Sequence, residues 1–200
     1  MGSINFDSKA ASWDTPEKIV RAKIFADKII SETAAGVGSA LEYGAGTGLV
    51  SFWLTKQFNH ITLGDSSAGM LEQAQKKIEQ LEVGNMGVKQ LDLAHENISQ
   101  QFEVIYSLLT MHHVKDVGQM FKQFYNCQPV GGKLLIADLD SEDGSFHGLE
   151  VDVHHGFDRE HIVALAQAAG YRDITIETLT EIKRDDRQRS YPVFVISATR

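Results

Sequence analysis

The chain has 200 residues, of which 42% are hydrophobic and 23% are charged, and its formal net charge is −8 with histidine counted as neutral. This composition is typical of a globular protein and excludes a disordered tail, a collagen-like chain and a disulfide-rich scaffold. At about 150 residues per domain, the length predicts one domain, residues 1–200. The acidic balance argues against nucleic-acid partners and anionic membrane surfaces, because a negative surface repels phosphate groups.

Cysteine content and the amino-terminal segment bear on the compartment. Cys127 is the only cysteine, so the chain forms no internal disulfide, which fits a reducing compartment. The polar segment 1–12 lacks the apolar core of a signal peptide. No apolar run approaches the ~18 residues that a membrane-spanning helix requires. We therefore expect a cytoplasmic protein without a membrane span.

Predicted helices and strands alternate along the chain. A first helix is expected from Pro16, because proline suits the first helical position and the apolar residues after it recur at helical spacing. Strands are then predicted at 39–44, 60–65, 87–91, 103–109 and 133–138, and helices at 48–57, from Ser66 or Ser67 to about 81, at 114–127 and at 158–169. Two further strands, 174–182 and 191–198, close the chain as a hairpin around the charged run 183–189.

This alternation predicts the fold class. Strands joined through helices require right-handed crossovers and give a mainly parallel sheet with helices on both faces. The last two strands have no helix between them, so they must pair antiparallel at or near one edge. We expect an α/β three-layer sandwich with a Rossmann-like sheet.

The segment 41–48, Leu-Glu-Tyr-Gly-Ala-Gly-Thr-Gly, joins the first predicted strand to its helix. In such a sheet, ligands bind beyond the carboxyl ends of the strands. The glycines allow a tight bend and remove side chains that would keep a ligand away from the backbone. The helix start expected after them would offer unpaired N–H groups to an anionic group. The segment therefore predicts a ligand-binding bend.

Carboxylates end the next two predicted strands. Asp65 lies 21 residues after Gly44, where an acidic residue accepts hydrogen bonds from ribose hydroxyls. Asp92 ends the third strand, where its carboxylate suits an exocyclic amine such as adenine N6. Met70 lies one helical turn past Asp65, either to pack on a base or to serve the helix core. Together with the bend, these residues predict a nucleoside-bearing ligand.

Two details select among nucleotides. The glycines are spaced G-x-G-x-G, and Leu49 stands where a dinucleotide-binding motif has its third glycine. Glu42 precedes the bend by two residues. A carboxylate there would repel a pyrophosphate and would attract the ammonium group of an amino acid.

At this point the chain resembles the class I S-adenosylmethionine-dependent methyltransferases, in particular the small-molecule branch that includes ubiquinone/menaquinone-type enzymes. The resemblance spans about 41–138 and is carried by Glu42-x-Gly44-x-Gly46-x-Gly48, Asp65, Asp92-Leu93 and the stretch 107–113, Ser-Leu-Leu-Thr-Met-His-His. It implies a seven-stranded sheet in which only the last strand is antiparallel, inserted between the fifth and sixth. It also divides the domain into an N-terminal lid and helix (1–36), a cofactor-binding core (37–139) and an acceptor-side loop, helix and hairpin (140–200).

The resemblance further implies S-adenosylmethionine as the cofactor, with S-adenosylhomocysteine as its product. Its implied contacts are Glu42, Tyr43, Gly44, Ala45 and Gly46 around the methionine moiety, Asp65 and Ser66 at the ribose, Met70, Asp92 and Leu93 at the adenine, and the backbone near Ser107 and Leu108 at the amino group. Trp13 resembles the aromatic lid position of this branch and is assigned to substrate binding.

The methyl acceptor is expected to be a small molecule, because no Asn-Pro-Pro-Tyr or Asp-Pro-Pro-Tyr string follows the fourth predicted strand, and a small protein acceptor stays open as an alternative. Besides Trp13, the predicted acceptor contacts are His112, His154 and His155. His112 and His155 are the selected candidate bases, from a wider set that also includes His113, His147 and His154. These histidines have a structural alternative, in which they support the pocket wall or the following helix. We expect no metal, since the chain contains neither H-E-x-x-H nor C-x-x-C.

The resemblance implies a single in-line displacement of the methyl group, in which alignment of the reactants and exclusion of water dominate. A base is needed only if the acceptor must lose a proton. Two other functions stay open: an NAD(P)-dependent oxidoreductase on the same fold, which Glu42 and the glycine spacing disfavour, and a cofactor-binding module without catalysis. The oligomeric state is not predicted.

Overall fold

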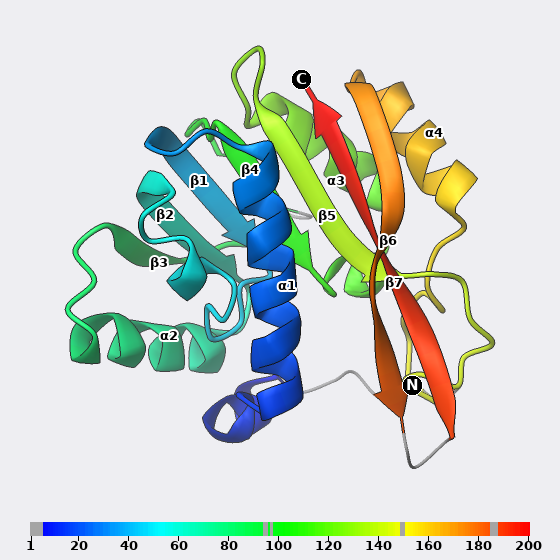
Figure 1. Cartoon of the computed structure of the whole chain (residues 1–200), viewed down its shortest axis with the longest axis horizontal. Coiled ribbons are helices and arrows are strands. Elements are labelled where there is room, and N and C mark those ends of the chain that lie inside the picture. The colour runs from blue at the N-terminus through cyan, green and yellow to red at the C-terminus, as the bar shows by residue number, and fades with distance from the viewer. Residues whose placement is uncertain (1–5, 94–95, 97, 149–150, 185–187) are drawn as a thin grey trace.

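Seven strands form one twisted sheet in the computed structural model, which describes residues 6–93, 96, 98–148, 151–184 and 188–200 (Figure 1). The strands are β1 (Val37–Tyr43), β2 (Phe58–Asp65), β3 (Met86–Gln90), β4 (Val104–Leu108), β5 (Lys133–Leu139), β6 (Arg172–Arg184) and β7 (Arg189–Thr199). The α-helices are α1 (Pro16–Glu32), α2 (Ala68–Gln80), α3 (Val117–Asn126) and α4 (Arg159–Ala169), and 3-10 turns occur at η1 (Asp7–Ser12), η2 (Ser51–Trp53) and η3 (Met111–His113).

The strand order is β3-β2-β1-β4-β5-β7-β6. The first five strands pair in parallel with their neighbours, and β7 runs antiparallel to both β5 and β6. The last strand in the sequence is therefore inserted between the fifth and the sixth, which confirms the predicted topology. The strand order changes direction between β1 and β4, because β2 and β3 follow on one side of β1, and β4 and β5 on the other. Ligands bind at such a switch point in this class of sheet.

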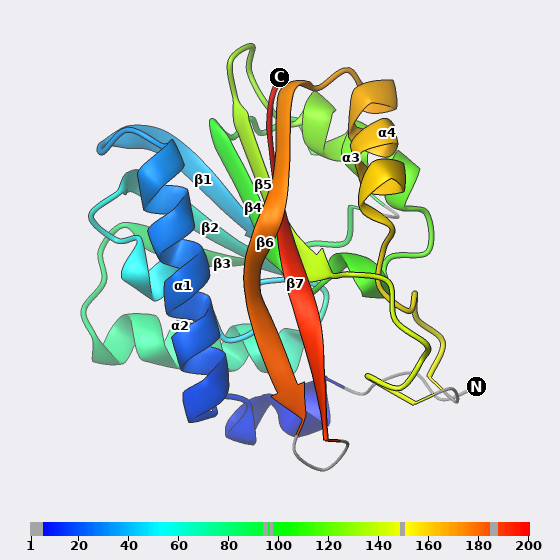
Figure 2. The ribbon, with the colours of Figure 1, turned by 45° about the vertical axis from the view of Figure 1, so that its right-hand side comes forward.

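Helices cover both faces of the sheet, so the three-layer prediction is confirmed (Figure 2). On one face, α1 and α2 pack through residues such as Phe25 and Leu71. On the other face, α3 and α4 pack through residues such as Phe124 and Ile162. Full burial of each such side chain stabilises the fold by about 1.5–3 kcal/mol, which fixes the helices against the sheet.

The helix boundaries follow local capping chemistry. The Ser67 hydroxyl accepts a hydrogen bond from the Met70 N–H at 3.2 Å, so Ser67, not Ser66, caps α2. Asp158 caps α4 by accepting from the His161 N–H, as predicted. Gly170 ends α4 with a φ of +106°, a left-handed conformation that favours glycine.

The helix predicted at 48–57 is wrong. In its place the chain makes the short turn η2, with hydrogen bonds of the 3-10 type from the Trp53 and Leu54 N–H groups to Val50 and Ser51. Glu42 contributes to this difference: its carboxyl accepts the Ser51 N–H at 3.2 Å, so this donor does not bond to the carbonyl four residues earlier, whereas the Phe52 N–H still bonds to the Gly48 carbonyl as in an α-helix. The bend therefore has no regular helix start behind it.

The terminal hairpin is longer than predicted. β6 covers Arg172–Arg184 where the pattern indicated 174–182, and irregularities in its pairing with β7 occur between Arg172 and Thr175 and between Thr178 and Thr180. Its residues are mostly exposed and polar, so the alternating apolar pattern fades before the strand ends. Within the predicted connection, residues 185–187 lie outside the described residues, as do residues 1–5 of the predicted N-terminal segment.

Candidate functional site

A cavity of about 670 Å³ opens at the carboxyl ends of the parallel strands. Of the predicted site residues, Trp13, Glu42, Tyr43, Gly44, Ala45, Gly46, Asp65, Ser66, Met70, Asp92, Leu108 and His112 line it. Leu93, Ser107, His154 and His155 are not among the lining residues. Most of the predicted cofactor contacts are therefore brought together at one place, whereas the predicted acceptor contacts are divided.

The glycine bend forms one wall of the cavity. Gly44 and Gly46 have φ values of +69° and +54°, which L side chains rarely adopt. A Cβ on Gly46 would lie 3.6 Å from Trp13 Nε1 and 3.9 Å from Met70 Sδ, inside the space between those two side chains. A Cβ on Gly44 would collide with Thr110 at 2.2 Å. Glycine at position 46 thus leaves this part of the cavity free, and glycine at position 44 allows Thr110 to pack behind the bend.

Asp65 faces the bend from the end of β2. Its carboxylate accepts hydrogen bonds from the Gly46 N–H at 2.7 Å and the Ser67 N–H at 2.8 Å. Burial raises the pKa of Asp65, and the hydrogen bonds from Ser67 and Gly46 oppose that rise. A carboxylate has about four lone-pair sites, so two backbone donors leave acceptor capacity for hydroxyl groups in the cavity.

Glu42 is buried at the end of β1, with 3% of its surface exposed. Its carboxyl accepts hydrogen bonds from the Ser51 N–H and hydroxyl, and that hydroxyl lies 2.6 Å from the Tyr106 hydroxyl. Burial raises the pKa of Glu42 to about 8. At neutral pH the carboxyl is therefore largely protonated until a cation in the cavity stabilises its ionised form.

Three of the predicted cofactor contacts, Asp92, Leu93 and Ser107, lie in different environments. Asp92 lines the cavity at the end of β3, and its backbone N–H donates to Glu96 Oε1 at 2.7 Å. Leu93 is fully buried in the core against α3, so its side chain is structural. Ser107 is also fully buried, and its hydroxyl donates to the Tyr43 carbonyl at 2.8 Å, which ties β4 to β1 below the bend.

Three imidazoles gather at the other end of the cavity, and we call His112, His113 and His147 the histidine cluster. His112 Nδ1 lies 2.6 Å from an oxygen of Asp138, a fully buried carboxylate. His112 Nε2 lies 3.0 Å from His147 Nε2. Burial lowers the pKa of His113 to about 3 and that of His147 to about 4, so both rings are neutral at physiological pH.

His154 and His155, expected at the acceptor, lie outside the cavity. A ring nitrogen of His154 is 3.0 Å from the Val114 carbonyl, and the His154 N–H donates to the His112 carbonyl at 2.8 Å. The His155 carbonyl accepts the Glu142 N–H at 2.9 Å. These contacts attach the loop after β5 to η3, which matches the structural alternative for the pair. The same loop brings His147 into the cavity.

The sequence interpretation missed a group of cationic side chains around the cavity. They are Lys9, Lys18, Arg21, Lys115 and Arg184. Lys9 and Arg184 lie near His147, because their charges help to depress its pKa. Arg21 is half-buried, and its guanidinium makes no hydrogen bond or ion pair with any described residue. The sequence contains one signal for this group: Lys18 and Arg21 lie three residues apart, about one helical turn, so their side chains would leave the same face of the helix.

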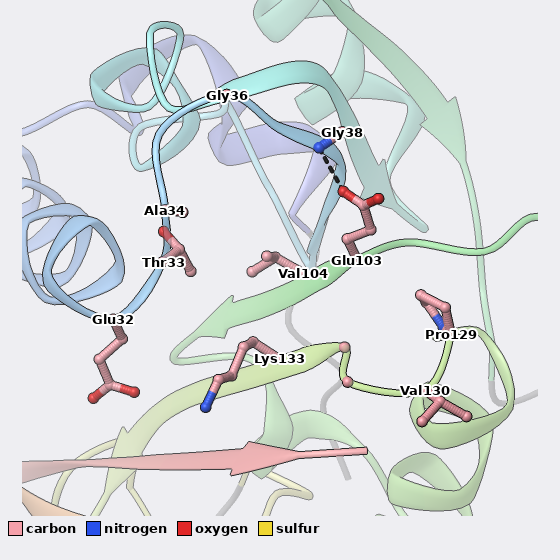
Figure 3. Close-up of a pocket in the computed structure, with 12 residues that line it drawn as sticks. Glu32, Thr33, Ala34, Gly36, Gly38, Glu103, Val104, Pro129, Val130 and Lys133 are labelled. Carbon is pink, nitrogen blue, oxygen red and sulfur yellow. Dashed lines mark hydrogen bonds between the residues drawn. The ribbon is translucent and has the colours of Figure 1, made fainter.

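A second hollow, of about 640 Å³, lies at the opposite end of the sheet, where β1, β4 and β5 begin (Figure 3). Glu103 occupies its wall and accepts the Gly38 N–H at 2.5 Å. The Lys133 ammonium at its margin donates to the Thr199 hydroxyl. Its charged groups are thus engaged with the protein, and it faces away from the strand ends at which ligands bind in this class of sheet.

Comparison with known proteins finds similarity to methyltransferases. Residues 40–132 match the family model described as a methyltransferase domain. An uncharacterized methyltransferase of Schizosaccharomyces pombe is 26% identical over 66% of this chain and 52% of its own length, and malonyl-[acyl-carrier protein] O-methyltransferase 1 of Ilyobacter polytropus is 29% identical over 69% and 52%.

Among solved structures, Haemonchus contortus phosphoethanolamine N-methyltransferase 2, in complex with S-adenosyl-L-methionine, superimposes with a TM-score of 0.74 at 16% identity. The match covers 100% of this chain and 60% of that one. This likeness shows the fold. The chain spans about half the length of the first curated relatives that it matches. Among the described residues, none of the helices combines the length and apolar character needed to cross a membrane.

Proposed function

We propose that this chain is a class I S-adenosylmethionine-dependent methyltransferase and that it transfers the methyl group of S-adenosylmethionine to a small-molecule acceptor; the match of residues 40–132 to the methyltransferase-domain model and the 26–29% identity to methyltransferases support this. The observation that carries the proposal is the convergence of the glycine bend, Asp65 and Glu42 on one cavity. S-adenosylmethionine, when bound, supplies a methyl group already activated by its positive sulfur. The protein's task is then to bind, orient and exclude water.

The residues around the bend fit this cofactor. Gly46 leaves open the space that a Cβ would take, beside Trp13 and Met70. Asp65 retains acceptor capacity for the ribose hydroxyls, and Asp92 lies in the same wall for the adenine amine. Glu42 would ionise beside a cation, since burial, and to a smaller extent the charge of Asp65, raise its pKa to about 8 in the absence of one. The methionine, ribose and adenine would thus lie along the tips of β1, β2 and β3.

The amino-terminal segment covers this region. The Phe6 and Trp13 rings meet edge to face with 5.8 Å between their centroids, and Phe6 also meets His113 at 5.2 Å. The Trp13 carbonyl accepts from the Lys18 ammonium at 3.0 Å. In our proposal residues 1–36 exclude water from the cofactor, residues 37–139 bind it, and residues 140–200 supply the acceptor side through His147 and Arg184.

The charges around the cavity favour an acceptor with a phosphate or carboxylate group. The whole chain carries a net charge of −8, yet Lys9 and Arg184 lie beside His147, and Arg21 lines the cavity with no hydrogen-bond partner among the described residues, although the charge of Glu17 on the same helix acts on it. A guanidinium whose donors are not used by the protein suits bidentate binding of such groups. Two similar proteins are named for acceptors of this kind, malonyl-[acyl-carrier protein] and phosphoethanolamine.

The proposal also extends to partners and compartment. We expect no nucleic-acid partner, since the net charge is −8. Cys127 is buried and unpaired, which agrees with the reducing cytoplasm.

Calorimetric titration with S-adenosylhomocysteine tests the methyltransferase proposal. We expect a micromolar dissociation constant, and a folded protein that binds neither this product nor S-adenosylmethionine would refute it. Methyl transfer is then measured with two matched pairs of acceptors that share the same nucleophilic amine, phosphoethanolamine against ethanolamine and phosphomonomethylethanolamine against monomethylethanolamine.

We expect turnover to favour the anionic member of each pair. Arg21→Met should raise the KM for the anionic acceptor about tenfold or more, because it removes a charged hydrogen-bond donor, and should leave the affinity for S-adenosylhomocysteine unchanged. Lys23→Met is the matched control on the same helix, since that ammonium pairs with Asp27 outside the cavity. Preference for the neutral acceptors would contradict the assignment of an anionic substrate.

A further inference from the structure

The histidine cluster has an arrangement that hydrogen bonding alone does not require. His112 and His113 come from η3, and His147 comes from the loop between β5 and α4. Their ligand nitrogens all lie within 4.8 Å of one another. The Nε2 atoms of His112 and His147 lie 3.0 Å apart, a hydrogen-bond distance at which one of the two nitrogens presents a lone pair to the other.

Asp138 determines which nitrogen of His112 is free to bind a ligand. One of its oxygens lies 2.6 Å from His112 Nδ1, and it also accepts the backbone N–H groups of His112 at 3.2 Å and Leu139 at 2.8 Å. A fully buried, acceptor-only carboxylate requires a proton on Nδ1, which leaves the lone pair of His112 on Nε2, directed at His147. A carboxylate behind a histidine in this way is the usual support of a metal-binding imidazole.

We propose that His112, His113 and His147 together bind one divalent transition-metal ion, for which zinc is the reference case, with Asp138 orienting His112. Zinc–nitrogen bonds of 2.0–2.1 Å in a tetrahedral site place the ligand nitrogens ~3.3 Å apart. The 3.0 Å between His112 and His147 is close to this spacing, and His113 must approach by at most about 1.5 Å, within reach of a rotation of its ring.

Three protein ligands leave the fourth metal position open, as in catalytic rather than structural zinc sites. All three histidines line the cavity, so the open position faces it. This inference rests on the proposed function in one respect: it assigns the fourth position to a phosphate or carboxylate oxygen of the anionic methyl acceptor. Binding of that oxygen to a metal ion would hold the acceptor in the cavity.

The proposal replaces the expectation of no metal, which relied on the absence of short ligand spacings. His147 lies 34 residues after His113 in the sequence, and only the folding of the loop after β5 brings it to η3. No spacing rule for neighbouring ligands reveals such a site.

The test uses the full chain without a polyhistidine tag. The protein is dialysed against a chelator and titrated with Co²⁺ or Zn²⁺ alone, and bound metal is measured by mass spectrometry and, for Co²⁺, by its visible absorption. We expect about one ion per chain and the absorption of a four- or five-coordinate site. Less than a tenth of an equivalent of either metal in folded protein would overturn the proposal.

Variants locate the site. His147→Ala should weaken metal binding at least tenfold, and Asp138→Asn should weaken it about 10–100-fold, as loss of a supporting carboxylate does elsewhere. His161→Ala removes an exposed histidine outside the cavity and should bind metal like the original chain. Undiminished binding in folded His147→Ala would show that the metal binds elsewhere and would overturn the proposal.

Calorimetry with S-adenosylhomocysteine is run in parallel on the metal-free and metal-loaded protein. Failure to bind this product would refute the methyltransferase proposal while leaving the metal result intact. Product binding without metal binding would overturn the metal proposal and leave the methyltransferase proposal intact.

Discussion

At the scale of single residues, Glu42 has two roles. Its carboxyl organises the bend by accepting both the N–H and the hydroxyl of Ser51, and it lines the cavity at the end of β1. Burial raises its pKa to about 8, against an ordinary value of 4.5. The residue is therefore a weak acid whose ionisation depends on whether a positive charge is nearby.

Glu42 should make the ligand-free protein less stable as the pH rises. Its pKa in the folded state lies above that in the unfolded state, so its contribution to stability is complete below about pH 4.5 and is lost as the pH rises through about 8. Glu42→Gln should remove most of this slope, because glutamine does not titrate. Thermal unfolding of both proteins between pH 5 and 8.5, without ligand, measures it. Equal slopes would show that Glu42 ionises freely in the fold.

Asp65 should determine cofactor affinity. Asp65→Asn replaces a charged acceptor at the ribose position and should weaken S-adenosylhomocysteine binding by ~1.5–3 kcal/mol, or about 10- to 150-fold. Titration calorimetry is the measurement, and Asp27→Asn, an exposed change on α1, is the control. Unchanged affinity in Asp65→Asn would reject the ribose assignment.

At the scale of elements, η1 is attached to the start of α2. The Asp7 carboxylate accepts hydrogen bonds from the Ser67 hydroxyl at 2.5 Å and the Gly69 N–H at 2.9 Å, and these bonds lower the pKa of Asp7. Gly69 permits the approach, because a Cβ there would lie 3.1 Å from Asp7 Cα. One side chain thus fixes the segment that covers the bend.

Asp7→Ala should release this cover. We expect S-adenosylhomocysteine to dissociate several-fold faster, with proteolysis of the segment 6–15 accelerated and the melting temperature little changed. Stopped-flow displacement measures the first effect and limited proteolysis the second. Asp27→Ala, which breaks an exposed ion pair on α1, serves as the matched control. An unaltered dissociation rate would mean that η1 does not restrain the ligand.

The elements also show what the sequence can and cannot predict. The strands and the cavity wall at their ends were predictable, because the glycine bend and Asp65 are short local patterns placed by the strand ends. The helix at 48–57 was not, because a side chain from β1 takes its first donor. His147 and Arg184 reach the cavity only through the folding of a loop and a hairpin, so no local pattern could place them.

The predicted acceptor contacts His154 and His155 could not be placed from the sequence for the same reason. Its composition suggested a reactive site, yet its contacts are with the backbone of neighbouring segments, namely the carbonyls of Val114 and His112 and the N–H of Glu142. Histidines act as hydrogen-bond partners of the main chain as readily as they act in chemistry. Which of the two applies is decided by tertiary structure.

At the scale of the whole molecule, charge is segregated. The chain is acidic overall, but cationic side chains from η1, α1, β6 and the segment before α3 surround a single cavity. The cavity also holds acidic groups, Glu42, Asp65 and Asp92, so the positive charge is local, and Lys9 and Arg184 provide it beside His147. A local positive potential draws in ligands of opposite charge, which agrees with the anionic acceptor proposed above.

The outermost strand, β6, has a consequence for handling the protein. An uncovered strand is a template on which other chains can assemble into aggregates. Here the strand is interrupted by two irregularities, carries mostly polar side chains, and is bound to α1 through the ion pair between Lys28 and Glu177. Such a border is poorly suited to edge-to-edge growth, so concentrated solutions should stay clear, and neutralising Glu177 and Glu181 together would promote precipitation.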